Sequence, residues 1–140
     1  MYYLDASLVV TFLTNEPDKD KVSDWLSGYV DGTLFISPWV ITEVASALSI
    51  KERRGDLTTE MRSAARGAFA LLCDQNLENK ALLDSHFESA ARFCDQVALG
   101  LRAGDALHLA IASHYGLTLV TRDTRLAEAG PLLGAATLLL

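Results

Sequence analysis

Four acidic residues occupy positions at which the surrounding pattern is apolar: Asp5, Glu43, Asp105 and Asp123. Carboxylates are almost never buried unless they are paired with a cation or bound to a metal. Four carboxylates that converge would repel one another, and their pKa values would rise unless a cation neutralised them. Because Mg2+ and Mn2+ prefer oxygen ligands of this kind, the pattern indicates a metal-dependent enzyme that acts on phosphate esters.

The local setting of each acid indicates that the four meet at one site. Asp5 and Asp123 each follow a predicted strand, and open α/β sheets bind ligands beyond the carboxyl ends of strands, near the point where strand order reverses. Asp105 opens a predicted helix, where the helix macrodipole favours an anion. Each acid alone could also be a helix cap or a surface residue. Glu43 fits that alternative least, because a glutamate within the apolar stripe of a helix needs a partner.

Short apolar runs alternate with helical patterns along the chain. The expected strands are 2–5, 34–36, 81–83, 118–121 and 137–139. The expected helices are 6–14, 19–27, 38–54, 57–72, 86–99, 105–115 and a short one that ends near residue 129, with a turn over 28–32. Ser37 and Pro38 are typical of an N-cap and a first helical residue. The order predicts one domain over residues 1–140, a three-layer α/β/α fold with a mostly parallel central sheet flanked by helices.

Composition limits the class of protein. The chain has 140 residues, of which 50% are hydrophobic and 21% are charged, as in a globular domain. No uncharged apolar run approaches the about 18 residues that cross a membrane, and no basic segment precedes the first apolar stretch as it does in a signal peptide. Cys73 and Cys94 form no CxxC pair, which argues against a disulfide scaffold and a zinc ribbon. We therefore expect a cytoplasmic protein with no membrane association.

The charge balance bears on the substrate. A formal net charge of −6 argues against non-specific affinity for nucleic acids, which depends on clustered Lys and Arg. It does not exclude a nuclease, because a metal would neutralise several acids and because basic residues gather between Lys51 and Arg54. The chain has neither GxGxxG nor GxxxxGK, which argues against dinucleotide and P-loop chemistry.

Four stretches together resemble a known family. Tyr-Leu-Asp-Ala-Ser at 3–7 resembles the opening of PIN-domain ribonucleases, as do the stretches 37–43, 102–110 and 120–123. Their order and spacing are most similar to those of VapC-type toxins from bacterial and archaeal toxin–antitoxin modules. The stretch 51–75 matches nothing specific, so no substrate identity follows from it. The resemblance implies that residues 1–140 form a single PIN-like domain.

The resemblance also implies an activity. It makes the chain a metal-dependent endoribonuclease, the toxin of a type II toxin–antitoxin system, with RNA as substrate and a cognate antitoxin as partner. Mg2+ or Mn2+ would be the cofactor, activating a water for in-line attack on a phosphodiester. By resemblance, the catalytic and metal-binding residues are Asp5, Glu43, Asp105 and Asp123, with Ser7 and Thr121 as supporting hydroxyls.

Three further residues lie within or next to these motifs. Arg102 and Arg122, each near one of the acids, could neutralise phosphate charge, although plain surface arginines fit the sequence equally well. His108 lies in the same helical pattern as Asp105. We interpret it as a packed or hydrogen-bonded histidine rather than as a metal ligand.

Two other functions are considered beside the ribonuclease. Phosphatases that use an aspartyl nucleophile need a second acid two positions after the first, where Ser7 stands, and receiver domains usually need a Lys after a late strand, where 120–123 has none. A catalytically inactive PIN-like binding module stays open as well. An intact acidic quartet argues against it, since such a cluster is costly without a metal.

The sequence also raises expectations about assembly. The hydrophobic content and the apolar run 138–140, a possible free sheet edge, predict a homodimer, which the resemblance implies as well. The helical patterns around 39–48 and 57–72 would form an apolar groove for an antitoxin peptide. A basic side chain of that peptide could pair with the carboxylates.

Overall fold

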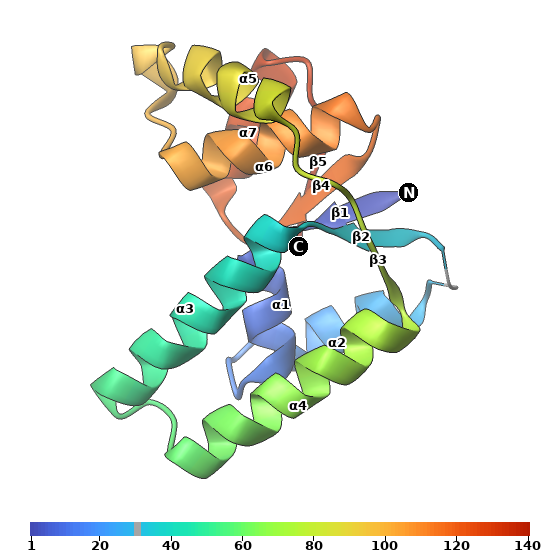
Figure 1. Cartoon of the computed structure of the whole chain (residues 1–140), viewed down its shortest axis with the longest axis vertical. Coiled ribbons are helices and arrows are strands. Elements are labelled where there is room, and N and C mark those ends of the chain that lie inside the picture. The colour runs from blue at the N-terminus through green and yellow to red at the C-terminus, as the bar shows by residue number, and fades with distance from the viewer. Residues whose placement is uncertain (30–31) are drawn as a thin grey trace.

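The central sheet has five strands, and every pairing in it is parallel. The structure, a computed structural model, describes residues 1–29 and 32–140. The strands are β1 (Tyr2–Leu4), β2 (Leu34–Ile36), β3 (Leu77–Asn79), β4 (Thr118–Thr121) and β5 (Thr137–Leu139), in the order β3-β2-β1-β4-β5. Helices flank the sheet on both sides (Figure 1). The predicted three-layer α/β/α fold with a parallel sheet is confirmed.

The order of the strands reverses beside β1. From β1 the chain adds β2 and then β3 on one side, and it later returns to place β4 and β5 on the other side. β4 pairs directly with β1, with Tyr3 opposite Leu119 and Leu4 opposite Val120. The carboxyl ends of β1 and β4 therefore lie side by side at the reversal point, where α/β sheets bind ligands.

Two groups of helices cover the sheet. In Figure 1, α1 (Ala6–Leu13), α2 (Lys19–Ser27), α3 (Pro38–Arg54) and α4 (Thr59–Gln75) lie toward one end of the view, and α5 (Asp84–Cys94), α6 (Ala103–His114) and α7 (Thr124–Leu132) lie toward the other. α3 and α4 form two long arms joined by a turn at Gly55, whose φ of 82° suits glycine.

β1, β4 and α6 contribute many of the most deeply buried residues. Tyr3, Leu4, Leu119 and Val120 are fully buried. α6 is buried along seven consecutive residues from Ala106 to Ala112. A helix buried this far has no solvent face on which to place a polar side chain, so any polar side chain within the run needs partners inside the protein.

The expected strand at 81–83 is wrong. The third strand is β3, whose Leu77 pairs with Leu34 of β2, and the amide of Lys80 still donates to the carbonyl of Ile36 at 2.8 Å. β3 is an edge strand, and only Leu77 of its three residues is buried. A strand with so little buried side-chain surface leaves no apolar run in the sequence.

Several helix boundaries differ from expectation: α1 ends at Leu13, α4 covers Thr59–Gln75 rather than 57–72, and α5 begins at Asp84 rather than at 86. α5 ends at Cys94, and a separate 3-10 turn covers Val97–Leu99, where one helix to 99 was expected. α6 begins at Ala103, so Asp105 is its third residue rather than its first. Residues 30 and 31 of the expected turn over 28–32 lie outside the described residues.

α7 continues past the expected end, through Gly130 and Pro131. A proline inside a helix cannot donate to the carbonyl four residues earlier. That carbonyl, on Ala127, instead accepts a 2.7 Å hydrogen bond from the hydroxyl of Thr137 in β5. Gly130 allows this contact, because a Cβ there would lie 2.2 Å from the methyl group of Thr137. Long-range packing therefore stabilises α7 beyond the residue at which the local sequence predicts its end.

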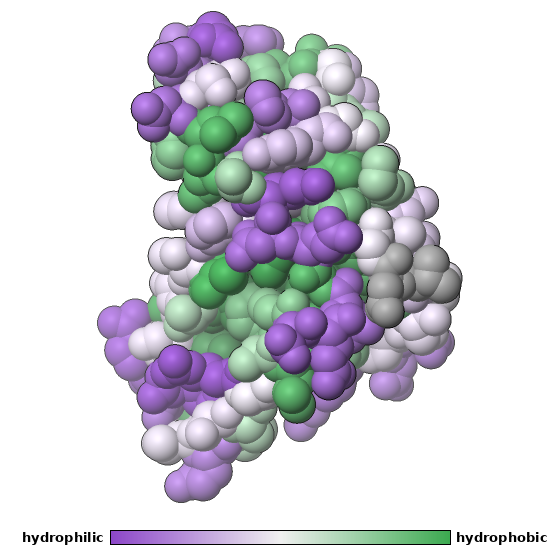
Figure 2. Space-filling model, turned by 45° about the vertical axis from the view of Figure 1, so that its right-hand side comes forward, coloured by the Kyte–Doolittle hydropathy of each residue, from purple (hydrophilic) through white to green (hydrophobic). Residues whose placement is uncertain are grey.

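Part of the apolar surface stays exposed. Leu132 is 71% exposed and Leu139, on the edge strand β5, is 47% exposed. On the face in Figure 2, apolar surface lies between bands of hydrophilic side chains. Within residues 1–29 and 32–140, no helix combines the length and the apolar character needed to cross a membrane.

Candidate active site

The four acids singled out in the sequence line one cavity. Its volume is about 430 Å³, and its walls include Asp5, Glu43, Asp105 and Asp123. Asp5 directly follows β1 and Asp123 lies just beyond β4, whereas Glu43 and Asp105 come from α3 and from the first turn of α6. The acids differ in exposure, since Asp5 is buried, Glu43 and Asp105 are half-buried and Asp123 is exposed. The four acids, which the sequence led us to expect at one site, therefore share one cavity.

Asp5 is held by three hydrogen bonds. Its Oδ1 accepts from the backbone amide of Leu8 at 3.0 Å, which caps α1, and from the hydroxyl of Ser7 at 2.7 Å. Its Oδ2 accepts from the hydroxyl of Thr121 at 2.5 Å. The two predicted supporting hydroxyls thus both donate to this carboxylate. Thr121 also accepts from the amide of Asp123 at 3.0 Å, and so links the acid after β1 to the acid after β4.

Asp123 and Asp105 each bond to the start of a helix. Oδ1 of Asp123 accepts from the amides of Arg125 at 2.8 Å and Leu126 at 3.1 Å, which caps α7. Oδ2 of Asp105 accepts from the amide of Arg102 at 3.3 Å. Burial raises the pKa of Asp105, and the negative charge of Asp123 adds to the rise, although the bond from Arg102 opposes it. Ionised Asp105 is therefore an unfavourable feature of the metal-free fold.

Glu43 reaches the cavity from α3 and pairs with a buried histidine. Its Oε2 lies 2.5 Å from Nε2 of His108, which is only 3% exposed. Nδ1 of that ring lies 3.2 Å from the hydroxyl of Tyr3. The interpretation of His108 as a packed, hydrogen-bonded histidine is confirmed.

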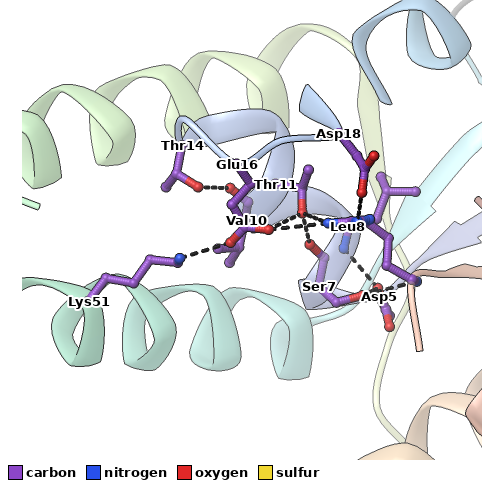
Figure 3. Close-up of polar contacts among 10 residues, drawn as sticks. Asp5, Ser7, Leu8, Val10, Thr11, Thr14, Glu16, Asp18 and Lys51 are labelled. Atoms are coloured by element: carbon purple, nitrogen blue, oxygen red, sulfur yellow. Dashed lines mark hydrogen bonds and ion pairs between the residues drawn. The ribbon is translucent and has the colours of Figure 1, made fainter. Parts of the chain in front are cut away.

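A fifth carboxylate, that of Glu16, was not singled out in the sequence. Glu16 accepts from the hydroxyl of Thr11 at 2.8 Å and forms ion pairs with Lys51 at 2.8 Å and with Arg122 at 3.2 Å. Figure 3 shows Lys51 reaching across from α3 to Glu16. Partial burial opposes ionisation, but the bonds from Lys51 and Thr11 lower the pKa of Glu16 overall. Its local sequence indicated only a helix end, and the partner that could have revealed it lies 106 residues away.

The two predicted phosphate-binding arginines have different surroundings. Arg122 lines the cavity, but its guanidinium donates to Thr11 at 2.8 Å and pairs with Glu16 and Asp18. Arg102 is exposed at the start of α6 and lines a smaller neighbouring cavity of about 90 Å³, which Asp105 and Asp123 also border. Arg102 thus faces the acids from outside, whereas Arg122 is already neutralised by two of its neighbours.

The donor set fits a hard divalent cation. The four acids supply carboxylate oxygens, the ligands that Mg2+ and Mn2+ prefer. Hydrogen bonds to Asp5 and Glu43 orient these carboxylates, as outer partners do in metal sites. Among the described residues, however, no group of three or more His, Cys, Asp and Glu side chains lies close enough together to hold an ion. The cavity presents suitable ligands without a ready-made coordination sphere.

Comparisons with known proteins agree with this fold. The sequence model of the PIN domain family matches residues 2–131. PAE2754 from Pyrobaculum aerophilum is 26% identical, with a TM-score of 0.67 over 97% of this chain and 89% of that one. VapC20 from Mycobacterium tuberculosis, described as a toxin that cleaves the sarcin–ricin loop, is 14% identical, with a TM-score of 0.74 over 93% and 95%. VapBC2 from Rickettsia felis, solved with a DNA fragment from its promoter, is 17% identical, with a TM-score of 0.65 over 98% and 96%. Among curated proteins none matches the sequence.

The surroundings of Asp5 and Asp105 predict opposite effects on stability for D5N and D105N. A carboxylate whose pKa is raised in the fold favours folding below its unfolded value of 3.8, and that contribution is lost as pH rises through the folded value. Without metal, D105N should therefore melt above the wild type at pH 7, and the difference should vanish below pH 3.8. D5N places an amide where two hydroxyls and the Leu8 amide donate, and should cost about 1–2 kcal/mol.

Melting curves followed by circular dichroism in a chelator, between pH 3 and pH 8, measure both effects. If D105N melts below the wild type at pH 7, the electrostatic account of Asp105 is wrong.

Proposed function

The chain belongs to the PIN domain family, and from that premise we propose that it is a divalent-metal-dependent endoribonuclease, the toxin of a type II toxin–antitoxin pair that acts in the cytoplasm. One observation carries the proposal: four carboxylates from four separate elements line one cavity where β1 and β4 meet. A protein gains nothing in stability by gathering like charges. A cation that binds them gives the arrangement a purpose. The description of VapC20 as a toxin that cleaves the sarcin–ricin loop supports RNA as the substrate class.

The residues of the cavity have distinct roles in this mechanism. Asp5, Glu43, Asp105 and Asp123 would hold the cation, which when bound activates a water and offsets phosphate charge. Ser7 and Thr121 orient Asp5 through its two oxygens. His108 has both ring nitrogens in hydrogen bonds and is not free to serve as the general base.

Other residues in and beside the cavity would contribute to substrate binding. Val10, Ala47 and Ile50 give the cavity an apolar side. Arg122 would contact a phosphate only by exchanging one of its carboxylate partners for it. We propose that the exposed Arg102, beside Asp105, makes the first contact with the substrate phosphate.

Loss of either of two cavity carboxylates should abolish RNA cleavage. Purified wild type should cleave single-stranded RNA with Mg2+ or Mn2+ and stop in a chelator. D5N and D105N should each lose more than about 100-fold in rate, since loss of the outer partners of a metal ligand already costs about 10–100-fold. The matched control is E88Q, which changes an exposed acid on α5 in the same chemical way. Near-normal cleavage by either variant, or by the wild type in a chelator, contradicts the proposal.

An apolar groove between α3 and α4 supports a protein partner. A cavity of about 510 Å³ lies between α3 and α4, with Ile41, Val44, Leu48 and Phe69 among its lining residues. Such a groove accepts the apolar face of an amphipathic helix. Ile41 and Val44 lie on the same helix as Glu43 but on a different face of it, so a partner in the groove would reach the carboxylates only with a segment that continues around α3. We propose an antitoxin segment with a basic side chain that pairs with these acids.

Expression experiments test the antitoxin. The chain alone should arrest growth of its host, and co-expression with the small protein encoded next to it should restore growth. I41K, which places a charge on a 40% exposed groove residue, should weaken that complex by about 10-fold while RNA cleavage continues. M61K, on an equally exposed residue outside the groove, is the control. Harmless expression of a soluble chain that cleaves RNA in vitro counts against a toxin.

We also propose a homodimer. β5 is an edge strand with an exposed Leu139, and Leu132 nearby is more exposed still, so a second copy could cover both. Two acidic cavities on one dimer would give the RNA a longer track. Light scattering at micromolar concentrations should give twice the chain mass of 15.2 kDa. L132E should shift the mass toward that of one chain, and a single-chain mass for the wild type at every dilution contradicts the dimer.

A further inference from the structure

Three buried polar side chains form a hydrogen-bonded chain that ends on Glu43. Ser37 Oγ lies 2.7 Å from the hydroxyl of Tyr3, which lies 3.2 Å from Nδ1 of His108. Nε2 of His108 lies 2.5 Å from Oε2 of Glu43. Ser37 and Tyr3 are fully buried and His108 is 3% exposed, whereas the side chain of Glu43 is 29% exposed. The chain therefore runs from the core to the cavity and reaches it at a single carboxylate.

Ser37 occupies an N-cap position but does not act as a cap. Serine at that position usually accepts a bond from an amide of the next turn. Here the side chain makes no capping bond and its hydroxyl bonds to Tyr3 instead. The first turn of α3 thus forgoes a cap so that a buried hydroxyl can complete the chain.

The protons of the chain have a consistent order. An ionised carboxylate only accepts, so Nε2 of His108 carries the proton that it donates to Glu43. With a neutral ring, Nδ1 accepts from Tyr3, and the oxygen of Tyr3 accepts from Ser37. With a protonated ring the last two bonds reverse, but Nε2 still donates to Glu43. The orientation of Glu43 is therefore the same in both charge states of the ring. Burial raises the pKa of Tyr3 far more than the bond with Ser37 lowers it, so the phenol keeps its proton.

The other oxygen of Glu43 is positioned by an absence of side chain. A Cβ on Gly104, the second residue of α6, would lie 2.9 Å from Oε1 of Glu43. Any residue larger than glycine would push this oxygen away. The carboxylate is thus held by a donor at Oε2, and the missing side chain of Gly104 leaves room for Oε1.

We propose that Ser37, Tyr3 and His108 are positioning residues that hold Glu43 ready to bind the divalent cation, and that position 104 is glycine because the carboxylate needs its space. This inference rests on the proposed function, in which Glu43 is a metal ligand. A histidine that only filled the core would need no donor aimed at a cavity carboxylate, and Ser37 would be free to cap α3. Outer partners of this kind typically change metal affinity by about 10–100-fold.

Four substitutions separate positioning from packing. H108L removes the donor to Glu43, and H108Q restores an N–H donor at a similar reach. Y3F removes the hydroxyl that bonds to Nδ1. G104A adds one methyl group against Oε1, the mobile end of a side chain, so that the carboxylate should move while the fold persists. Its matched control is G67A, because a Cβ at Gly67 on α4 would meet nothing within 4 Å.

The readout is the affinity for Mn2+, measured from the loss of the free-ion signal in electron paramagnetic resonance, with denaturant unfolding alongside. H108L and G104A should weaken Mn2+ binding by about 10–100-fold, Y3F by less, and H108Q should stay within a few-fold of the wild type. G104A should unfold at a denaturant concentration no lower than that of the wild type, because alanine is a better helix former than glycine, and G67A should bind Mn2+ normally. Because G104A keeps the core intact, it decides the matter even if H108L does not fold.

The possible results separate the positioning role from the ribonuclease proposal. Wild-type Mn2+ affinity in both G104A and Y3F overturns the positioning role, while the ribonuclease proposal stands if the wild type cleaves RNA. Weakened Mn2+ binding in G104A and Y3F, by a protein that does not cleave RNA, supports the positioning role and overturns the ribonuclease. A wild type that binds no Mn2+ overturns both.

Discussion

Negative charge held in a confined space is the constraint that shapes this molecule around its cavity. Five carboxylates line it, and their repulsion must be limited without the protonation that would remove their ability to bind a cation. The structure does this by giving each acid its own donors: hydroxyls and an amide for Asp5, a histidine for Glu43, helix amides for Asp123, and two cations for Glu16. Asp105 accepts one bond, from the amide of Arg102, and burial raises its pKa.

The same constraint accounts for Arg122. A guanidinium in an acidic cavity is expected to pair with the acids nearest to it, and Arg122 pairs with Glu16 and Asp18, beyond the end of α1. These pairs, with the one between Lys51 and Glu16, connect the loop after β4, the α1–α2 loop and the last turn of α3. Ion pairs as well as packing therefore hold together the segments that form this wall of the cavity. The sequence indicated the charge of Arg122 but not its partners.

Local patterns predicted most of the fold. β2, β4 and β5 have the bounds expected from their apolar runs, and α2 and α3 have the bounds expected from helical periodicity and from Gly55. Two of the failures, at β3 and at the end of α7, share a cause, which is long-range contact. β3 is a strand because β2 pairs with it, and α7 runs through Pro131 because Thr137 satisfies the carbonyl that the proline leaves free.

The site was predictable to a similar extent. The four acids could be named because carboxylates stand out within apolar patterns, and the structure places all four on one cavity. Glu16 and the hydrogen-bonded chain from Ser37 to His108 could not be identified from the sequence. A glutamate in a loop, a serine before a proline and a tyrosine in a strand each have an ordinary local explanation. Their shared setting exists only after segments 34 and 105 residues apart come together.

The central place of β1 in the sheet has a consequence for how the protein is made. β1 leaves the ribosome well before β4, which is one of its two neighbours in the sheet. One of the two hydroxyls that hold Asp5 belongs to a residue 116 positions later. Pairings so distant in sequence form slowly and late. A nascent chain therefore exposes Asp5, and later Glu43, without an assembled cavity, and the cavity is complete only once residue 123 has emerged and β4 has docked. A chain whose synthesis has not reached residue 123 therefore lacks the complete cavity.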